Sequence, residues 1–150
     1  MTQRVTRSIT VRRPHDEVAA FATDPHRVLE VIPGFSRYAY VGEGPSADEE
    51  LWDVFLEVGT LHVGGRVLVS HPSAHRLEWH SQRGATHSFT MTVEPVGEHT
   101  QLTMSLTYAF SGSVSARLAE LVGRGIVGRH LDAGLEQIRH LLEHEERPSR

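Results

Sequence analysis

The sequence contains no cysteine, no lysine and no asparagine among its 150 residues. Without cysteine, the chain has no disulfide framework, no thiolate metal site, no thiol nucleophile and no iron–sulfur cluster. No apolar run approaches the ~18–20 residues that a membrane span requires, and the first residues lack the apolar core of a signal peptide. We therefore expect a cytoplasmic protein with no stable membrane insertion.

The sequence also has no large excess of positive or negative residues. The chain has 15 arginines against 19 acidic residues, and its formal net charge is −4 with neutral histidines. It lacks the basic footprint that nucleic-acid binding requires, so we expect no nucleic-acid partner. Lysine and asparagine have A-rich codons, so a GC-rich coding sequence explains their absence. We attribute the 11 histidines to composition as well, and we expect no metal and no other cofactor.

The length and the 39% hydrophobic fraction are typical of one soluble domain with a sizeable core. We assign residues 1–150 to a single domain, in which residues 143–150 form a polar tail. Asp24 and Pro25 predict the N-cap and the first residue of the second of two short helices. Alternation of apolar and polar residues predicts strands over 3–12, 35–41, 51–58, 61–70, 75–82, 86–95 and 101–110.

Apolar or small residues recur every three or four positions from Val114 to Leu142. This spacing predicts one helix about 45 Å long. An antiparallel sheet with one apolar face must cover that face, and this helix is the only element with enough apolar length. The pattern therefore predicts an α+β fold, in which a curved antiparallel sheet wraps around a long C-terminal helix and two short helices follow the first strand.

The apolar stripe of the last helix contains Gly125 and Gly128 where leucines stand on either side. A glycine inside a helix costs about 1 kcal/mol relative to alanine. Two interpretations stay open: close backbone packing or a kink, and a ligand cavity between the helix and the sheet. Arg124, beside these glycines, could face such a cavity.

The order of elements and two stretches of sequence resemble the START-like superfamily, also called the polyketide cyclase/dehydrase and lipid-transport group. The stretches are SITVRRPHDEVAAFATDPHRVLEVIPGF and LTYAFSGSVSARLAELV with HLDAGLEQIRHLLE, and the resemblance extends from about Val5 to Leu142. Over VGGRVLVSHPSAHRLEW, the chain is also similar to the subgroup related to an accessory protein of carbon monoxide dehydrogenase. The resemblance implies a helix-grip fold whose deep cavity takes a lipid, a polyketide or a quinone-like molecule.

Some members of this superfamily cyclise and dehydrate poly-β-ketone chains, with a tryptophan–proline-rich segment after the first helix and a functional arginine near the end of a central strand. This chain departs from both features. The segment reads DPHRVLEVIPGF and has no tryptophan, and the strand ends in Val69-Ser70-His71 without an arginine, although Arg66 is nearby. We therefore expect binding of a small hydrophobic molecule. Two alternatives stay open: a polyketide cyclase/dehydratase-type enzyme, and an accessory subunit for maturation or recruitment of a redox enzyme. The sequence also leaves open whether the protein forms a homodimer or binds a protein partner.

The candidate ligand-binding residues are strand residues with large apolar side chains, together with arginines and glycines near the predicted cavity. They are Trp52, Arg66, Trp79, Phe89, Met91, Met104, Tyr108, Arg124, Gly125 and Gly128. Methionine suits a deformable pocket, and tryptophan and tyrosine combine apolar area with one hydrogen-bonding group. For each strand residue, plain core packing is the alternative. Further polar candidates are His62, His80, His87 and His130, and no catalytic residue can be named.

Two patterns contain histidines at metal-ligand spacing. The segment His140–His144 matches the HxxEH pattern of inverted zinc peptidases, and we interpret it as a solvated helix end. His71 and His75 flank a turn and form at most a fortuitous surface pair. Strand alternation also places Arg66 and His62 opposite Val63, Val67 and Val69, and leaves open which set faces the core.

Overall fold

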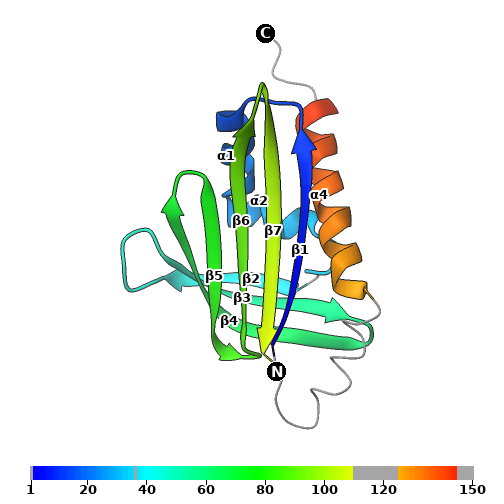
Figure 1. The fold of residues 1–150 in the computed structure, drawn as a ribbon. Coiled ribbons are helices and arrows are strands. Elements are labelled where there is room, and N and C mark those ends of the chain that lie inside the picture. The colour runs from blue at the N-terminus through cyan, green and yellow to red at the C-terminus, as the bar shows by residue number, and fades with distance from the viewer. Residues whose placement is uncertain (1, 36, 110–124, 145–150) are drawn as a thin grey trace.

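The computed structural model describes residues 2–35, 37–109 and 125–144. Their elements are β1 (Thr2–Val11), α1 (His15–Ala22), α2 (Pro25–Val31), β2 (Arg37–Glu43), β3 (Glu50–Val58), β4 (Leu61–Ser73), β5 (Arg76–Gly84), β6 (His87–Val96), β7 (His99–Ala109) and α4 (Ile126–His144). The seven strands of the described ranges form one curved antiparallel sheet (Figure 1), and the predicted α+β order is confirmed. None of the helices described is long and apolar enough to cross a bilayer.

The strand order explains why two helices follow β1. The sheet runs β1-β7-β6-β5-β4-β3-β2, so the two edge strands are consecutive in the sequence. The chain between them has to cross from one edge of the curved sheet to the other, and α1 and α2 make that crossing. Their apolar residues thereby cover part of the concave face (Figure 1).

The hydrophobic core lies on the concave face, as strand alternation predicts. Along the middle of the three adjacent strands β5, β6 and β7, the inward residues are buried. They are Leu77, Trp79, Phe89, Met91, Val93, Leu102, Met104, Leu106 and Tyr108. Every second residue of a strand points inward, so each of these strands contributes every second side chain to the buried layer.

Local sequence sets the start of both short helices. The Asp24 carboxylate accepts a hydrogen bond from the His26 backbone N–H at 3.0 Å, and Pro25 is the first residue of α2. Proline suits this position because its φ is already helical and its missing N–H would have no helical partner. Helix α1 has Asp16 and Glu17 in its first turn, where the helix dipole favours negative charge. The predicted cap is confirmed.

Helix α4 is anchored near both ends and so bridges distant parts of the chain. Near its start, His130 Nε2–H donates to the Glu57 carbonyl oxygen at 3.0 Å, at the end of β3. Near its end, the Glu143 carboxylate accepts a hydrogen bond from the Arg12 backbone N–H at 2.6 Å, just after β1. The helix lies alongside β1 between these anchors (Figure 1), where it covers the core.

The bounds of α4 differ from the prediction at both ends. Gly125 has a φ of 81°, outside the helical region, so α4 begins at Ile126. The predicted part of the helix that starts at Val114 lies outside the described residues. At the other end, α4 continues through Glu143 and His144, past the predicted end at Leu142, and the hydrogen bond from Arg12 holds this last turn.

Two glycines of α4 allow a neighbouring residue to approach the helix closely. A Cβ at Gly128 would clash with the guanidinium of Arg7, whose side chain is 41% exposed. A Cβ at Gly134 would lie 2.8 Å from Cγ1 and 3.3 Å from Cα of the buried Ile32. The Arg7 tip can move away, whereas Ile32 is held by its own backbone and by the core around it.

We expect the Gly134→Ala variant to be less stable than the Gly128→Ala variant by about 1–3 kcal/mol, the usual cost of overpacking. Both variants gain the same helix propensity, so the difference isolates the contact with Ile32. Urea denaturation followed by circular dichroism measures both free energies of unfolding. Equal values for the two variants would contradict the close approach of α4 to Ile32.

Candidate functional site

Four of the predicted ligand-binding residues form a closed layer on the concave face. Trp79, Phe89, Met91 and Met104 are each fully buried. The Trp79 indole stacks on the Phe89 ring with centroids 4.3 Å apart, and Met91 is the cross-strand neighbour of Met104. Such close packing leaves these side chains as core, and they could form only the floor of a ligand site.

This layer ends in a cluster of side chains with polar atoms, which we call the His87 cluster: Trp79, His87 and Tyr108. Trp79 Nε1–H donates to His87 Nε2 at 3.3 Å, and His87 Nδ1 lies 3.0 Å from the Ala85 carbonyl oxygen. An indole N–H can only donate and a carbonyl oxygen can only accept. His87 is therefore a neutral imidazole protonated at Nδ1. Tyr108 is its cross-strand neighbour on β7.

Burial sets the protonation of the His87 cluster. It lowers the pKa of His87 below the ordinary value of 6.5, and the hydrogen bond to Ala85 opposes that shift only in part. Burial also raises the pKa of the Tyr108 phenol far above its ordinary value of 10. Both effects penalise the charged form of the group. The cluster is therefore uncharged at neutral pH while still carrying polar atoms.

Beside the His87 cluster, the concave face is less completely covered. Val67 and Val69 are fully buried on β4, whereas Leu61 and Val63, on the same side of the strand, are only partly buried. Ile126, the first residue of α4, is also only partly buried. This end of the concave face therefore presents apolar side chains that the described core does not enclose.

The predicted site residues of the C-terminal segment have different surroundings. Arg124 lies outside the described residues. Gly125 adopts a left-handed φ of 81°, which glycine tolerates and other residues rarely adopt. Gly128 packs against Arg7, whose Nε lies 3.3 Å from Asp132 Oδ2. The backbone conformation at Gly125 and the close contact with Arg7 at Gly128 each explain why glycine stands there.

Arg66 lies on the convex face of the sheet, away from the core. Val67 and Val69 are the residues of β4 that face inward, so Arg66 faces outward with its cross-strand partner Asp53. Arg66 Nε donates to Asp53 Oδ1 at 2.7 Å and Nη2 donates to Oδ2 at 3.2 Å. These hydrogen bonds hold the pKa of Asp53 below its ordinary value. This placement corrects the expectation that Arg66 lines a cavity on the concave face.

Trp52 borders a different hollow, between α2 and the edge strand β2. Its indole meets the rings of His26 and Tyr40 edge-on, at centroid distances of 4.7 and 5.6 Å. The hollow has a volume of ≈ 260 Å³ and is lined by His26, Arg27, Glu30, Tyr38, Ala39, Tyr40 and Trp52. Sequence patterns do not reveal this group, because its aromatic rings come from three elements far apart in the chain.

One side chain of each histidine-containing pattern, His71 and Glu143, ties separate elements of the fold together. His71 Nε2–H donates to the Thr23 carbonyl oxygen at 2.8 Å, which ties β4 to the end of α1. In the His140–His144 segment, Glu143 accepts the hydrogen bond that anchors the last turn of α4, and two arginines lie within ion-pair distance of its carboxylate. Among the other polar candidates, His80 Nε2 lies 3.3 Å from Glu78 Oε1, and His62 is exposed on the convex face.

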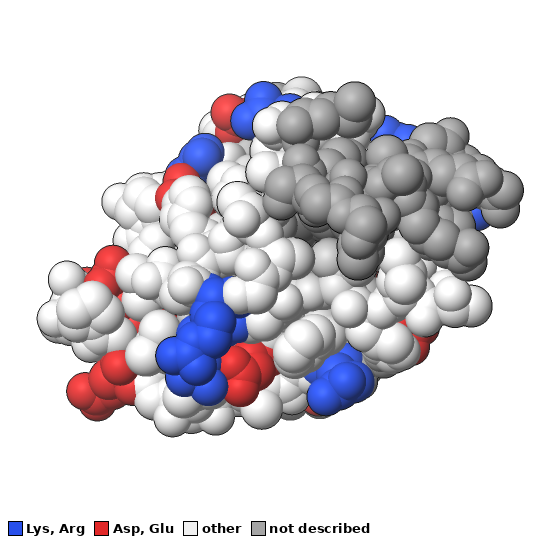
Figure 2. All heavy atoms as spheres, turned by 90° about the horizontal axis from the view of Figure 1, so that it is seen from below, with Lys and Arg blue, Asp and Glu red and all other residues white. Residues whose placement is uncertain are grey.

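Charged side chains are distributed in small groups over the surface. Figure 2 shows the molecule from below, where basic and acidic groups stand beside one another and uncharged surface separates them. Over the atoms coloured in that view, no broad field of one sign is present. The Arg66–Asp53 pair is one example of this local neutralisation.

We expect the His87→Gln variant to lose about 1–2 kcal/mol of stability above pH ~7, because its hydrogen bonds to Trp79 and Ala85 are weakened. Unfolded histidine titrates near pH ~6.5 and folded His87 titrates lower, so on acidification the unfolded state binds the proton first. The stabilising effect of His87 is therefore complete above the pKa of the unfolded histidine, and it is lost as the pH falls toward the lower pKa of His87 in the folded protein.

The difference in stability between wild type and His87→Gln should accordingly shrink between about pH 8 and about pH 5. Urea unfolding at a series of pH values measures this difference. A difference that does not change with pH would argue against a buried neutral His87.

Solved structures share this fold at low sequence identity. The Zhui aromatase/cyclase from Streptomyces sp. R1128 is 15% identical, with a TM-score of 0.78 over 99% of this chain and 98% of that chain. A START superfamily protein from Mycobacterium smegmatis is 14% identical, with a TM-score of 0.62 over 90% of this chain and 98% of the other. Norcoclaurine synthase from Thalictrum flavum is 16% identical, with a TM-score of 0.63 over 98% and 90%. These likenesses show the fold.

No curated protein matches the sequence. The sequence model of one family matches residues 2–143, which include every described strand and nearly all of α4. The same residues build the curved sheet, the two crossing helices and the covering helix described above. The chain belongs to the polyketide cyclase/dehydrase and lipid transport family.

Proposed function

We propose that the protein binds a small, largely apolar molecule between the concave face and α4, and that it does so without chemical change. The observation that carries this proposal is the partial burial of Leu61, Val63 and Ile126 among the described residues, beside the uncharged His87 cluster. Lipid, polyketide and quinone-like molecules fit this chemistry. Membership in a family described by polyketide cyclisation and lipid transport supports the same class of ligand.

The two parts of this site would contribute differently to binding. Apolar contact with Leu61, Val63 and Ile126 is non-directional and grows with the area removed from water. A few polar atoms in an apolar pocket orient the ligand. Tyr108, with its phenol held neutral, is the best placed to do so, because it lies opposite His87 on the inner side of β7.

Catalysis at the same place is less well supported. The Zhui protein is an aromatase/cyclase by name, and such chemistry needs a group that accepts or donates a proton. Both ring nitrogens of His87 are already hydrogen-bonded, and a phenol with a strongly raised pKa is a poor acid. Arg66 lies on the convex face. Binding alone therefore agrees better with the geometry.

A protein partner is the second candidate, because the edge strand β2 exposes large apolar side chains. Tyr38, Tyr40 and Val41 are 36%, 48% and 42% exposed, and an exposed edge strand can add a strand from another chain. If copies pair in this way, light scattering should show a dimer, and Val41→Lys should convert it to a monomer. A wild-type monomer that co-purifies with no larger protein would contradict a partner at β2.

Ligand binding can be tested with two variants of adjacent residues on β4. Val63 lies on the inner side of the strand and His62 on the outer side. We expect Val63→Trp to fill the proposed site and weaken binding of the apolar fluorophore 1-anilinonaphthalene-8-sulfonate at least about tenfold, which is about 1.4 kcal/mol. The matched control His62→Trp should bind like wild type.

Native mass spectrometry after incubation with a cellular lipid extract then identifies the ligand class. A retained mass that is lost on denaturation, and that is absent from Val63→Trp, is the expected result. Thermal unfolding of each variant confirms that it is folded. The proposal fails if the folded wild type retains neither fluorophore nor lipid, or if folded Val63→Trp binds both as well as wild type.

A further inference from the structure

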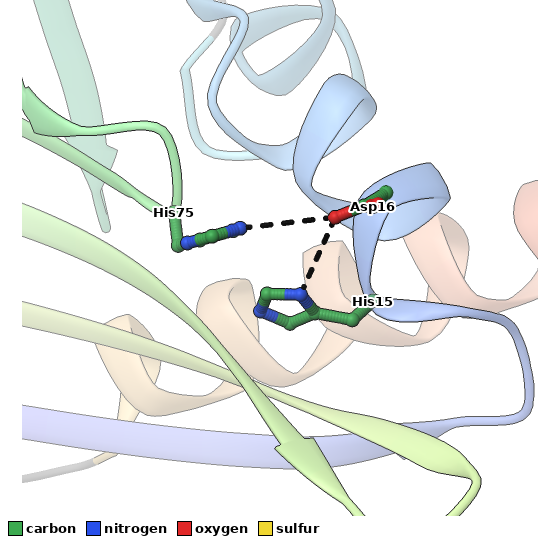
Figure 3. Close-up of side chains that lie close together, drawn as sticks. All are labelled: His15, Asp16 and His75. Carbon is green, nitrogen blue, oxygen red and sulfur yellow. Dashed lines mark ion pairs between the residues drawn. The ribbon is translucent and has the colours of Figure 1, made fainter.

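Three side chains that can ligate a metal meet where α1 begins. His15 and Asp16 are the first two residues of α1, and His75 lies in the turn between β4 and β5 (Figure 3). Asp16 Oδ1 lies 3.6 Å from His15 Nδ1 and 3.9 Å from His75 Nε2. The ligand atoms of the three residues all lie within 4.8 Å of one another. Figure 3 shows both imidazoles directed toward the carboxylate.

We propose that His15, Asp16 and His75 bind a late first-row divalent cation, with Zn²⁺ as its representative. In a tetrahedral zinc site with bonds of ~2.0–2.1 Å, ligand atoms lie about 3.3 Å apart. The separations from Asp16 to the two histidines are within about 0.6 Å of that value. Because all three ligand atoms lie within 4.8 Å of one another, side-chain rotations can bring them onto one metal ion.

The donor set decides the class of metal. Two imidazole nitrogens and one carboxylate oxygen suit Zn²⁺, Ni²⁺ or Cu²⁺, whereas Mg²⁺ and Ca²⁺ take oxygen ligands. Asp16 is 96% exposed, so water reaches the cluster and can supply the remaining ligand. A site with three protein ligands and one water has the coordination number that zinc prefers.

The backbone on both sides of the cluster is held in place. In the turn, the His75 N–H donates to Ser73 Oγ at 3.1 Å, and the His75 carbonyl oxygen accepts from the Val93 N–H at 3.0 Å. At the start of α1, the Val18 N–H donates to the Pro14 carbonyl oxygen at 3.1 Å. Only side chains need to move for the three ligands to converge, which lowers the cost of binding.

The arginines next to the cluster in sequence have carboxylate partners of their own. Arg13 Nε lies 3.6 Å from Glu17 Oε2, and Arg76 Nε donates to Glu78 Oε2 at 2.5 Å. The positive charges that would most oppose a cation are therefore locally neutralised. Asp16 is left to balance part of the charge of the metal at the mouth of the cluster.

A bound metal would join α1 to the β4–β5 turn. Because the unfolded chain does not hold the three ligands together, metal binding would raise the stability of the folded protein. His75 is hydrogen-bonded to Val93, near the end of β6, whereas His87 is the first residue of β6. The metal site is thus separate from the proposed ligand site, and each can fail independently.

The test uses untagged full-length protein that has been stripped of metal. Calorimetric titration with ZnCl₂ should give one site per chain, and His75→Ala should weaken it at least about tenfold, since even loss of an indirect metal partner costs 10–100-fold. Asp16→Asn should weaken it as well. At free Zn²⁺ of about 100 times Kd, wild-type Tm should rise by about 5 °C or more.

The matched control is the double variant His140→Ala/His144→Ala, which removes the other histidine pair, whose rings lie 5.1 Å apart on α4. It should bind Zn²⁺ like wild type. In chelator, His75→Ala should have a Tm close to that of wild type, since the hydrogen bonds that hold the turn are made by the backbone of His75 and not by its ring. The proposal is overturned if wild type binds no Zn²⁺, if His75→Ala binds it equally well, or if the α4 variant loses it.

Discussion

The apolar concave face of the sheet is the constraint on which the rest of the structure depends. Seven antiparallel strands place one side chain in two on this face, so a continuous layer around Trp79 and Phe89 must be shielded from water. Helices α1 and α2 shield it because the chain has to cross between the edge strands. Helix α4 completes the cover, held by His130 near its start and by Glu143 near its end.

The proposed ligand site lies where the described part of the chain leaves Leu61, Val63 and Ile126 only partly buried. The side chains of the concave layer around Trp79 and Phe89 are fully buried, so a ligand could reach between them only if they moved. At Leu61, Val63 and Ile126 the apolar surface continues but is only partly enclosed. Burial keeps the polar atoms beside it uncharged. An apolar surface with a few neutral polar groups suits binding better than proton transfer.

The histidines show how one residue type takes different roles according to its partners. His87 accepts from an indole and donates to a carbonyl, so it is locked as one neutral tautomer. His71 and His130 each donate to a backbone carbonyl and tie separate elements together. His15 and His75 instead face the same carboxylate from different segments. From the sequence alone, all 11 histidines are attributed to composition, because they do not cluster along the chain.

The sequence by itself determined the elements and their inward faces. Alternation predicted which side of each central strand holds Trp79 or Phe89, and Asp24 with Pro25 predicted the start of α2. These features depend on backbone geometry within a few residues. The tertiary structure alone decided that Arg66 faces outward and that His75 meets Asp16. Such contacts depend on the strand order and on how the helices cross the sheet, which bring together residues that no local pattern connects.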